Sequence, residues 1–345
     1  MSEKQCSSHG SGSDDSNISY GDGEHLHANP GDTIGTWKLK QRVGTGQFGL
    51  VWTVEADDTK VLKIMRSGAE YAEMIESEIK ILQSISCFDY IVSLSDVFVY
   101  TDTDQHHHRV MVFEKIDRDL FSLLHDREDA VPIDEGKRLI RQLLRGVGAL
   151  EKEGIVHFDL KPENILVGKG PTLKICDFGT ARRMPVIEVP DFGKTCEYRA
   201  PEVIMELNGC NEKSDVWSAA CVAYEIITAM YKKSRCLFEP REVYLIEDID
   251  DDDEEIDLNH LYVMQEVLGP IPKHMYRHCK EYFTVRGELR GIGKVVPCSF
   301  LDLMYEDGIG EVEAWIGFLN PMLRYNPKKR VRAIDMIDHA CCSCT

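Results

Sequence analysis

The stretch that decides the fold reads His157-Phe158-Asp159-Leu160-Lys161-Pro162-Glu163-Asn164. Three of its side chains together suit phosphoryl transfer. Asp159 can accept the proton of a hydroxyl group, Lys161 can neutralise a transferred phosphoryl group, and Asn164 can bind a metal ion. A lone Asp or Asn is more often structural, so the interpretation depends on what surrounds this stretch.

Two further motifs follow in the same direction along the chain. Asp177-Phe178-Gly179 supplies a second oxygen ligand, Asp177, of the type that Mg²⁺ prefers beside phosphates. Ala200-Pro201-Glu202 comes after it. The order and spacing of the three motifs favour a catalytic site over isolated structural residues, with Asn164 and Asp177 as the predicted metal ligands.

A glycine-rich stretch, Gly44 to Val51, precedes these motifs and fits the pattern G-x-G-x-x-G-x-V. Glycines let backbone N–H groups approach phosphates closely. Strand-like runs flank the stretch on both sides, which favours a phosphate-covering hairpin over a dinucleotide-binding turn. The residues predicted to contact ATP here are Val43, Gly44, Thr45, Gly46, Gln47, Phe48, Gly49, Leu50 and Val51.

A lysine in the next strand-like run, Lys63, could pair with the nucleotide phosphates. Its best acidic partner is Glu78, on the helix predicted over residues 70–82, although Glu73 and Glu76 compete for that role. Alone, such a lysine is usually a surface residue; after a glycine-rich hairpin it is a candidate catalytic residue.

Taken in this order, the motifs are the signature set of protein kinases, and the chain resembles the eukaryotic protein kinase family from residue 36 to about residue 340. The resemblance implies transfer of the ATP γ-phosphoryl group with Mg²⁺, and Lys161 is the Ser/Thr-specific form. It further implies that Phe113 is the gatekeeper and that the backbones of Glu114 and Ile116 bind adenine. Two structural pairings are also implied: Glu202 with Arg330, and Asp215 with the catalytic loop.

The hydrophobic pattern agrees with an α+β, bilobal kinase fold. Residues 36–113 contain short β-prone runs and form the expected N-lobe; residues 114–340 are mainly helical and form the expected C-lobe. Val216 to Ile227 is apolar nearly all round, so a buried helix is predicted. Residues 1–35 read as a disordered tail, and residues 341–345 as a Cys-rich tail for which a zinc site or a prenylation signal is the less favoured interpretation.

The second half of the chain resembles the SR-protein kinases, which phosphorylate Ser in Arg-Ser repeats. The resemblance is carried by several stretches: residues 195–203, 214–221, 237–240, 281–284, 287–290 and 318–323. A LAMMER-type or dual-specificity kinase of the same CMGC group is the near alternative. A pseudokinase scaffold would lack a catalytic residue, yet Lys63, Asp159, Asn164 and Asp177 are all present.

From Glu247 to Asp257 only Ile249 and Ile256 are not acidic. Such a run is often a solvated loop. In the SR-protein kinases that this chain resembles, however, an acidic docking groove occupies the region just before the helix that Leu261 would begin here. We therefore expect an Arg-rich substrate peptide to dock on Asp250, Asp251, Asp252, Asp253, Glu254, Glu255 and Asp257.

One departure concerns regulation. Phe158 stands where many kinases have the Arg that pairs with a phosphorylated activation loop, and the loop between Gly179 and Ala200 is short. These features indicate activity without loop phosphorylation. Val61 also replaces the usual Ala near adenine.

Composition limits the partners. The net charge of −19 disfavours direct nucleic-acid binding and is compatible with basic Arg/Ser-rich protein substrates. No apolar run is long enough to span a membrane, and the scattered cysteines among the 12 in the chain fit reduced thiols. We expect a monomer in the cytoplasm, the nucleus or both.

Overall fold

The structure is a computed structural model that describes residues 25–46, 48–85, 88–170, 172–187, 190, 197–207, 210–239, 252–277, 279–292 and 294–342. Its contacts divide the chain into two compact units. The first, called here the sheet unit, runs to Glu73 and includes Val97–Val112; the second, the helical unit, comprises Met74–Asp96 and the chain from Phe113 onwards. The expected division at residues 113 and 114 misses this interleaving.

The interleaving has a local cause in the segment that follows the first long helix. Ile91 forms a parallel bridge with Ile175, Val92 donates its N–H to the Ile175 carbonyl at 2.9 Å, and the Ile175 N–H bonds the Tyr90 carbonyl at 2.9 Å. This segment therefore belongs with the helical unit although N-lobe strands lie on both sides of it in the sequence.

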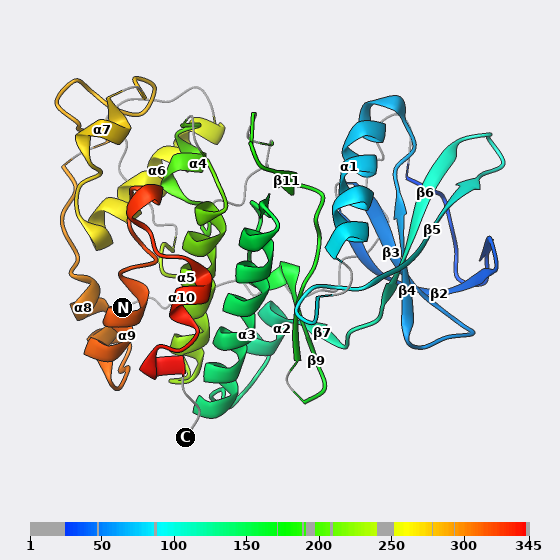
Figure 1. The fold of residues 1–345 in the computed structure, drawn as a ribbon, viewed down its shortest axis with the longest axis horizontal. Coiled ribbons are helices and arrows are strands. Elements are labelled where there is room, and N and C mark those ends of the chain that lie inside the picture. Colours follow the sequence, from blue (N-terminus) through cyan, green and yellow to red (C-terminus); the bar gives the residue numbers. More distant parts are fainter. Residues whose placement is uncertain are drawn as a thin grey trace, which may run out of the picture. The chain divides into compact units, whose positions relative to one another are not determined.

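A six-stranded sheet of order β1-β2-β3-β4-β6-β5 organises the N-terminal part of the chain (Figure 1). Alternate residues of its strands, such as Leu50, Trp52 and Leu62, are buried in one apolar cluster, as a strand with one packed face requires. The strands are β1 (Thr33–Ile34), β2 (Trp37–Gly46), β3 (Gly49–Val54), β4 (Lys60–Met65), β5 (Leu94–Thr101) and β6 (His107–Glu114).

Part of the disordered tail predicted over residues 1–35 is folded against the sheet. Leu26 is only 5% exposed and packs in the same cluster as Ile34, and Thr33–Ile34 pairs with β2. Burial of these side chains against the sheet outweighs the polar composition of their neighbours. Residues 1–24 of the predicted tail lie outside the described part of the chain.

The remaining chain is mostly helical, as predicted, with short strands that hold the catalytic segments. Its helices are α2 (Leu120–His125), α3 (Ile133–Lys152), α4 (Pro201–Ile204), α5 (Lys213–Ala229), α6 (Asp252–Leu268), α7 (Lys273–Tyr276), α8 (Phe300–Glu306), α9 (Val312–Leu319) and α10 (Ala333–Met336); α1 (Ala69–Ile85) precedes them. The short strands are β7 (Arg118–Asp119), β8 (Ile155–Val156), β9 (Ile165–Gly168), β10 (Thr172–Ile175) and β11 (Arg182–Arg183).

Helix α5 is the central element of the helical unit. Its residues from Ser214 to Ala229 are buried, as the all-round apolar pattern predicted, and it packs against the amphipathic α3. Among its polar members, Asp215, Ser218, Glu225 and Thr228 are also buried. Each forms a hydrogen bond with another part of the unit, so α5 carries both the core and its internal polar contacts.

The first two residues of the predicted Cys-rich tail are packed against the helical unit. Cys341 and Cys342, in the 3₁₀ turn Ala340–Cys342, are 3% and 0% exposed, and this turn contacts α3 and α9. Helix α9 ends at Leu319. The cysteines that the structure describes are thiols rather than disulfides, and the described residues contain no cluster suited to a metal ion.

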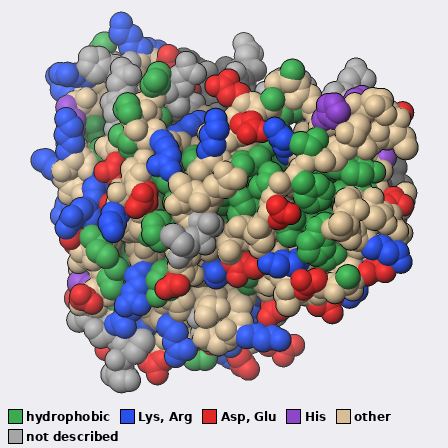
Figure 2. Space-filling model, turned by 45° about the vertical axis from the view of Figure 1, so that its right-hand side comes forward, with side chains coloured by type: hydrophobic (Ala, Val, Ile, Leu, Met, Phe, Trp, Pro, Cys, Tyr) green, Lys and Arg blue, Asp and Glu red, His purple; other side chains and the backbone are tan. Residues whose placement is uncertain are grey.

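Charges of both signs lie on the face shown in Figure 2, where Lys and Arg side chains are interspersed with Asp and Glu. The net charge of −19 therefore does not make this face uniformly acidic. Within the described residues, no helix is long and apolar enough to cross a membrane.

Candidate active site

The catalytic segment lies in a loop that two strands hold at its ends. It leaves β8, passes through a 3₁₀ turn (Pro162–Asn164) and enters β9, which pairs with β10 in register Ile165 to Ile175. This hairpin brings the end of the segment to the residue before Asp177: the Cys176 N–H donates to the Asn164 carbonyl at 2.9 Å. This hydrogen bond therefore joins Asn164 to the neighbour of Asp177, although the two predicted metal ligands are distant in sequence.

The side chains of Asp159, Lys161 and Asn164 converge. The Asn164 amide nitrogen donates to the Asp159 carbonyl and to Asp159 Oδ2, both at 2.8 Å, and Lys161 Nζ lies 3.1 Å from the same Oδ2. The amide donor of Asn164 and the cationic Lys161 meet the same carboxylate oxygen and together fix the orientation of the Asp159 carboxylate. The other oxygen, Oδ1, is then the one suited to receive a proton.

The same geometry bears on whether Asn164 fits a metal ion. Both partners of its amide nitrogen are pure acceptors, so the –NH₂ group must face them and the amide oxygen is left as the ligand atom. Amide and carboxylate oxygens are what Mg²⁺ accepts in proteins. The chemistry of Asn164 and Asp177 therefore fits the predicted metal site.

His157 links the catalytic segment to the segment that carries Asp177. Its Nε2 bonds the Cys176 carbonyl at 2.9 Å, and its Nδ1 accepts the N–H of Asp159 at 3.3 Å. Burial lowers the pKa of His157. The neutral Nε2–H form satisfies both bonds, and sequence reasoning had assigned this residue no role.

Asp215 on α5 anchors the loop, as the family resemblance implied. Its two carboxylate oxygens accept the backbone N–H groups of His157 at 2.7 Å and of Phe158 at 2.9 Å. Phe158 has φ of 68° and Asp177 has φ of 61°, a left-handed region that a residue with a Cβ rarely adopts. Such backbone persists where surrounding contacts over-determine it, and here it occurs beside the predicted catalytic base and at the predicted metal ligand.

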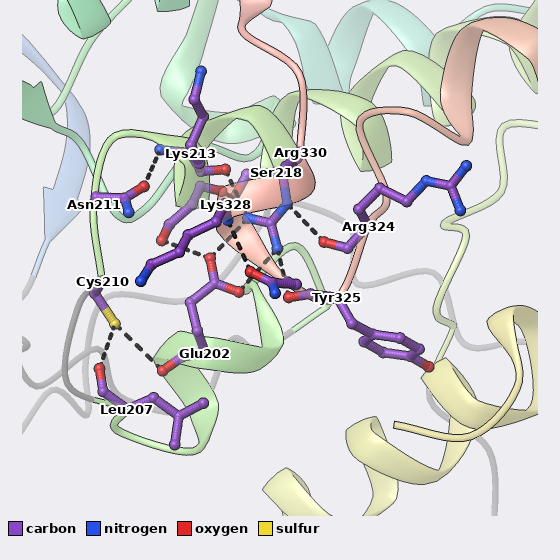
Figure 3. A network of polar contacts seen from close by, with 12 residues as sticks. Glu202, Leu207, Cys210, Asn211, Lys213, Ser218, Arg324, Tyr325, Lys328 and Arg330 are labelled. Carbon is purple, nitrogen blue, oxygen red and sulfur yellow. Dashed lines mark hydrogen bonds and ion pairs between the residues drawn. The ribbon is translucent and has the colours of Figure 1, made fainter. Parts of the chain in front are cut away.

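The predicted pairing of Glu202 with Arg330 is confirmed (Figure 3). The guanidinium is bidentate to the carboxylate at 2.7 and 2.9 Å, both side chains are buried, and the guanidinium lies 5.1 Å from the centre of the Trp217 ring. The loop of residues 195–202 is called here the substrate loop. A buried, bidentate ion pair of this kind fixes the end of that loop relative to the chain near its C-terminus.

The substrate loop is held from α2 and α5 by a contact that the sequence did not reveal. Tyr198 donates its hydroxyl to Glu225 Oε2 at 2.7 Å, while His125 Nε2 lies 2.7 Å from Glu225 Oε1. The hydrogen bond to Glu225 raises the pKa of His125. These residues are separated by long stretches of chain, so only the folded structure could bring them together. Thr195 and Cys196, at the start of the loop, lie outside the described residues.

The nucleotide-binding elements of the sheet unit are described by themselves. Strands β2 and β3 form the predicted hairpin, with Gly44 opposite Val51 and Gly46 opposite Gly49. A Cβ on Gly49 would lie 2.7 Å from the Ile64 carbonyl, so close packing requires glycine there. Gln47 lies outside the described residues. Val43, 54% exposed, remains a predicted contact of ATP, as do Thr45, Phe48 and Leu50.

Lys63 lies directly opposite Val51 in the pairing of β4 with β3. Paired residues share a face of the sheet, and the buried neighbours Leu62 and Ile64 occupy the other face. Lys63 and Val51 are therefore adjacent on the face away from the apolar cluster. On α1, Glu78 is 1% exposed, whereas Glu73 is exposed. The pairing of Lys63 with one of these carboxylates stays a prediction.

Side chains of the predicted adenine-binding segment can also be placed. Phe113 is buried, and Glu114 and Ile116 are partly buried, at the end of β6 and just after it. The carboxylate of Glu114 bonds Lys174 Nζ at 2.6 Å, a contact that sequence reasoning did not foresee. Their roles in adenine binding stay predictions.

The acidic run does not end before α6: from Asp252 onwards it forms the beginning of that helix. Asp252, Asp253, Glu254 and Glu255 form the first turn of α6, so the helix begins well before Leu261. Acidic residues are favoured there because the helix dipole is positive at its N-terminus. Asp250 and Asp251 lie outside the described residues, as do the side chains of Asp252, Asp253 and Glu254.

Asp257 is the member of the predicted docking set whose contacts are visible. Its Oδ2 accepts the Tyr282 hydroxyl at 3.0 Å, and its Oδ1 lies 3.6 Å from Arg199 of the substrate loop. It is partly buried, and it ties the second turn of α6 to the substrate loop. The acidic end of α6 therefore lies within a short reach of that loop.

Comparison with known proteins agrees with this geometry. The family model for the protein kinase domain matches residues 37–341. The chain belongs to the protein kinase family. Its fold, an N-terminal antiparallel sheet followed by a mostly helical region, is that of the family.

Individual relatives are distant. Serine/threonine-protein kinase SRPK of Physarum polycephalum is 29% identical, over 88% of this chain and 85% of its own length. Serine/threonine-protein kinase AFC2 of Arabidopsis thaliana is also 29% identical, over 92% of this chain and 79% of its own. So is mitogen-activated protein kinase sty1 of Schizosaccharomyces pombe, over 87% and 78%. These relatives indicate a Ser/Thr kinase of the CMGC type, but three kinds of kinase at one level of identity leave the substrate class open.

Proposed function

We propose that this kinase transfers the γ-phosphoryl group of ATP to Ser in basic Arg/Ser-rich protein segments, such as those of SR-type splicing factors. The observation that carries the proposal is the contact between Asp257 and Arg199, which links the acidic end of α6 to the substrate loop. A cationic peptide lying on that loop would meet carboxylates on α6. Complementary charge of this kind raises the encounter rate and specificity more than it raises affinity.

The chemistry follows from the catalytic segment. Asp159 Oδ1 accepts the proton of the substrate hydroxyl, while Oδ2 stays bound to Asn164 and Lys161. Lys161 neutralises negative charge on the phosphoryl group during its transfer. Asn164 and Asp177 would hold Mg²⁺, which supplies neutralisation of the ATP phosphates. Positioning and electrostatics thus provide most of the catalysis, as in phosphoryl transfer generally.

The test is a panel of Ser peptides that differ only in their flanks: Arg-Ser repeats, Lys-Ser repeats, proline-directed sites and acidic flanks. We expect the highest kcat/KM with Arg-Ser repeats, and phosphosites that map to Ser. An Asp159→Ala variant is the control and should lose at least about a hundredfold in kcat. If that variant transferred phosphate as fast as the wild type, the measured activity would come from a contaminant. The chain would then be a pseudokinase scaffold.

A second candidate is a proline-directed or LAMMER-like CMGC kinase, because sty1 and AFC2 match this chain as well as SRPK does. It predicts that the panel favours Ser-Pro or mixed sites. Charge on α6 separates the candidates further: Glu255→Lys should raise KM for the Arg-Ser peptide and flatten its dependence on salt. If the acids of α6 serve only the helix dipole, KM stays constant while stability falls.

We further propose that the kinase is active without phosphorylation of its activation loop. Phe158 is 5% exposed at the position where many kinases place an Arg that binds the loop phosphate. The enzyme made in bacteria and treated with phosphatase should keep its full kcat. Inactive enzyme that a second kinase revives would contradict this. We also propose a monomer in the cytoplasm, the nucleus or both, which light scattering and imaging of the tagged chain would check.

A further inference from the structure

An ion pair joins the end of β6 to β10. Lys174 Nζ lies 2.6 Å from Glu114 Oε1, and the two side chains are 22% and 30% exposed. The same Oε1 accepts the N–H of Ser93 at 2.7 Å, and Lys174 Nζ also donates to the Ile91 carbonyl at 3.4 Å. All four residues belong to the helical unit. A charged pair that also satisfies two backbone groups is fixed more tightly than a surface salt bridge.

The contacts around this pair form a continuous path. Glu114 donates its own N–H to the Ser93 carbonyl at 3.3 Å, so it holds Ser93 through both backbone and side chain. The residue before Ser93, Val92, bonds the Ile175 carbonyl at 2.9 Å. Lys174, the neighbour of Ile175 on β10, closes the ring from the other side.

The two ends of this path are the two ends of the expected nucleotide site. Glu114 begins the backbone predicted to bind adenine. At the other end, Cys176 donates its N–H to the Asn164 carbonyl at 2.9 Å and precedes Asp177. Asn164 and Asp177 are the predicted ligands of the metal that accompanies the phosphates. One ligand, ATP with its metal, must satisfy both ends at once.

We propose that Lys174 is a positioning residue that sets the register between the predicted adenine-binding backbone at Glu114 and the predicted metal ligands Asn164 and Asp177. This inference rests on the proposed kinase function. Lys174 Nζ is bonded to Glu114 Oε1 and to the Ile91 carbonyl, so it acts through Glu114. Holding both ends in register beforehand lowers the ordering cost that ATP pays when it binds.

The consequence is specific to ligands that reach both ends. Lys174→Met should weaken binding of Mg·ADP about three- to tenfold, a typical coupling between contacting residues. Adenosine, which reaches only the adenine end, should bind with little change. KM for ATP should rise by a similar factor while kcat stays within about twofold, since ground state and transition state lose the same interaction.

A matched control separates positioning from general stability. Lys213 and Glu151 form another partly buried pair, with Nζ and Oε1 2.7 Å apart, at the start of α5 and the end of α3. Lys213→Met removes an equivalent ion pair and should lower the melting temperature without changing Mg·ADP affinity. Lys174→Arg should keep most of the wild-type affinity, and the exchange Lys174→Glu with Glu114→Lys should recover part of it.

Calorimetric titration with Mg·ADP and competition binding with adenosine give the decision. Selective loss for Mg·ADP in Lys174→Met, absent in Lys213→Met and non-additive with Glu114→Gln, supports the inference. Equal loss for both ligands, or unchanged Mg·ADP binding in Lys174→Met beside a binding-competent wild type, overturns it. Failure of the wild type itself to bind Mg·ADP would instead refute the proposed function.

Discussion

Asp215 Oδ1 accepts the backbone N–H of Phe158 at 2.9 Å, and the peptide it holds has a left-handed φ of 68° immediately before Asp159. The position of the predicted catalytic base therefore depends on a carboxylate buried in α5. Burial raises the pKa of Asp215 to about 7, while the two backbone N–H donors of His157 and Phe158 oppose that rise. Because these two effects on Asp215 oppose each other, the contact that holds the catalytic segment is sensitive to changes at Asp215.

Replacing Asp215 by Asn should cut kcat about ten- to a hundredfold, because a slight displacement of Asp159 is costly to phosphoryl transfer. The amide offers only one acceptor oxygen and turns an N–H donor toward a backbone N–H. The matched control is Asp307→Asn, since Asp307 is equally buried and accepts from Tyr224 and Arg235 elsewhere. Steady-state kinetics and thermal unfolding check both variants; an equal fall in kcat for the two would contradict the prediction.

Replacing Asn164 by Ala should raise the Mg²⁺ concentration needed for half-maximal activity by about tenfold or more, because a ligand oxygen and the donor to Asp159 are both lost. Activity measured across a series of Mg²⁺ concentrations is the readout. Asn326→Ala, which removes a turn-capping side chain outside the site, should leave the Mg²⁺ dependence unchanged. A normal Mg²⁺ requirement in Asn164→Ala would remove this residue from the metal site.

Replacing Arg330 by Met should destabilise the protein by about 3–5 kcal/mol, because Glu202 is left buried without its partner. The double variant Arg330→Met with Glu202→Leu should recover much of that loss, since no uncompensated charge remains. Denaturant unfolding measures both. A double variant less stable than Arg330→Met would show that the pair is worth more than the removal of its charges.

Acid should destabilise the protein through His260 on α6. Burial lowers the pKa of His260 to about 3, below the ordinary value of 6.5 that it has when unfolded. Between those values the unfolded chain binds the proton and the folded chain does not, so stability falls as pH drops from about 6.5 towards 3. The resulting loss of unfolding free energy reaches about 5 kcal/mol at most.

Carboxylates titrate in the same range, so the measurement is a difference between two proteins. Unfolding free energies of the wild type and of His260→Phe are compared at pH 7 and pH 5. The wild type should lose more stability than the variant, because Phe has no proton to bind. Parallel pH profiles would show that His260 is not held neutral in the folded state.

How much the sequence predicted can be judged from particular elements. The hairpin of Gly44 and Val51, the buried helix from Val216 to Ile227 and the change from strands to helices follow from local patterns of hydrophobicity and glycine. The burial of Leu26 did not, because it depends on contacts with distant strands. The start of α6 did not either, because a run of acids looks like a loop until it lies at the N-terminus of a helix.

The sequence by itself determined the chemistry: Asp159, Lys161, Asn164 and Asp177 are named by their order and spacing, because a motif contained in a few residues survives any change in its surroundings. Tertiary structure alone decided what holds them. Asp215, which binds the backbone immediately before Asp159, comes from a distant part of the chain, and a hydrogen bond depends on a distance of about 3 Å that no linear pattern records. For that reason the reaction could be inferred from motifs, whereas the contacts that position its residues became visible only in the fold.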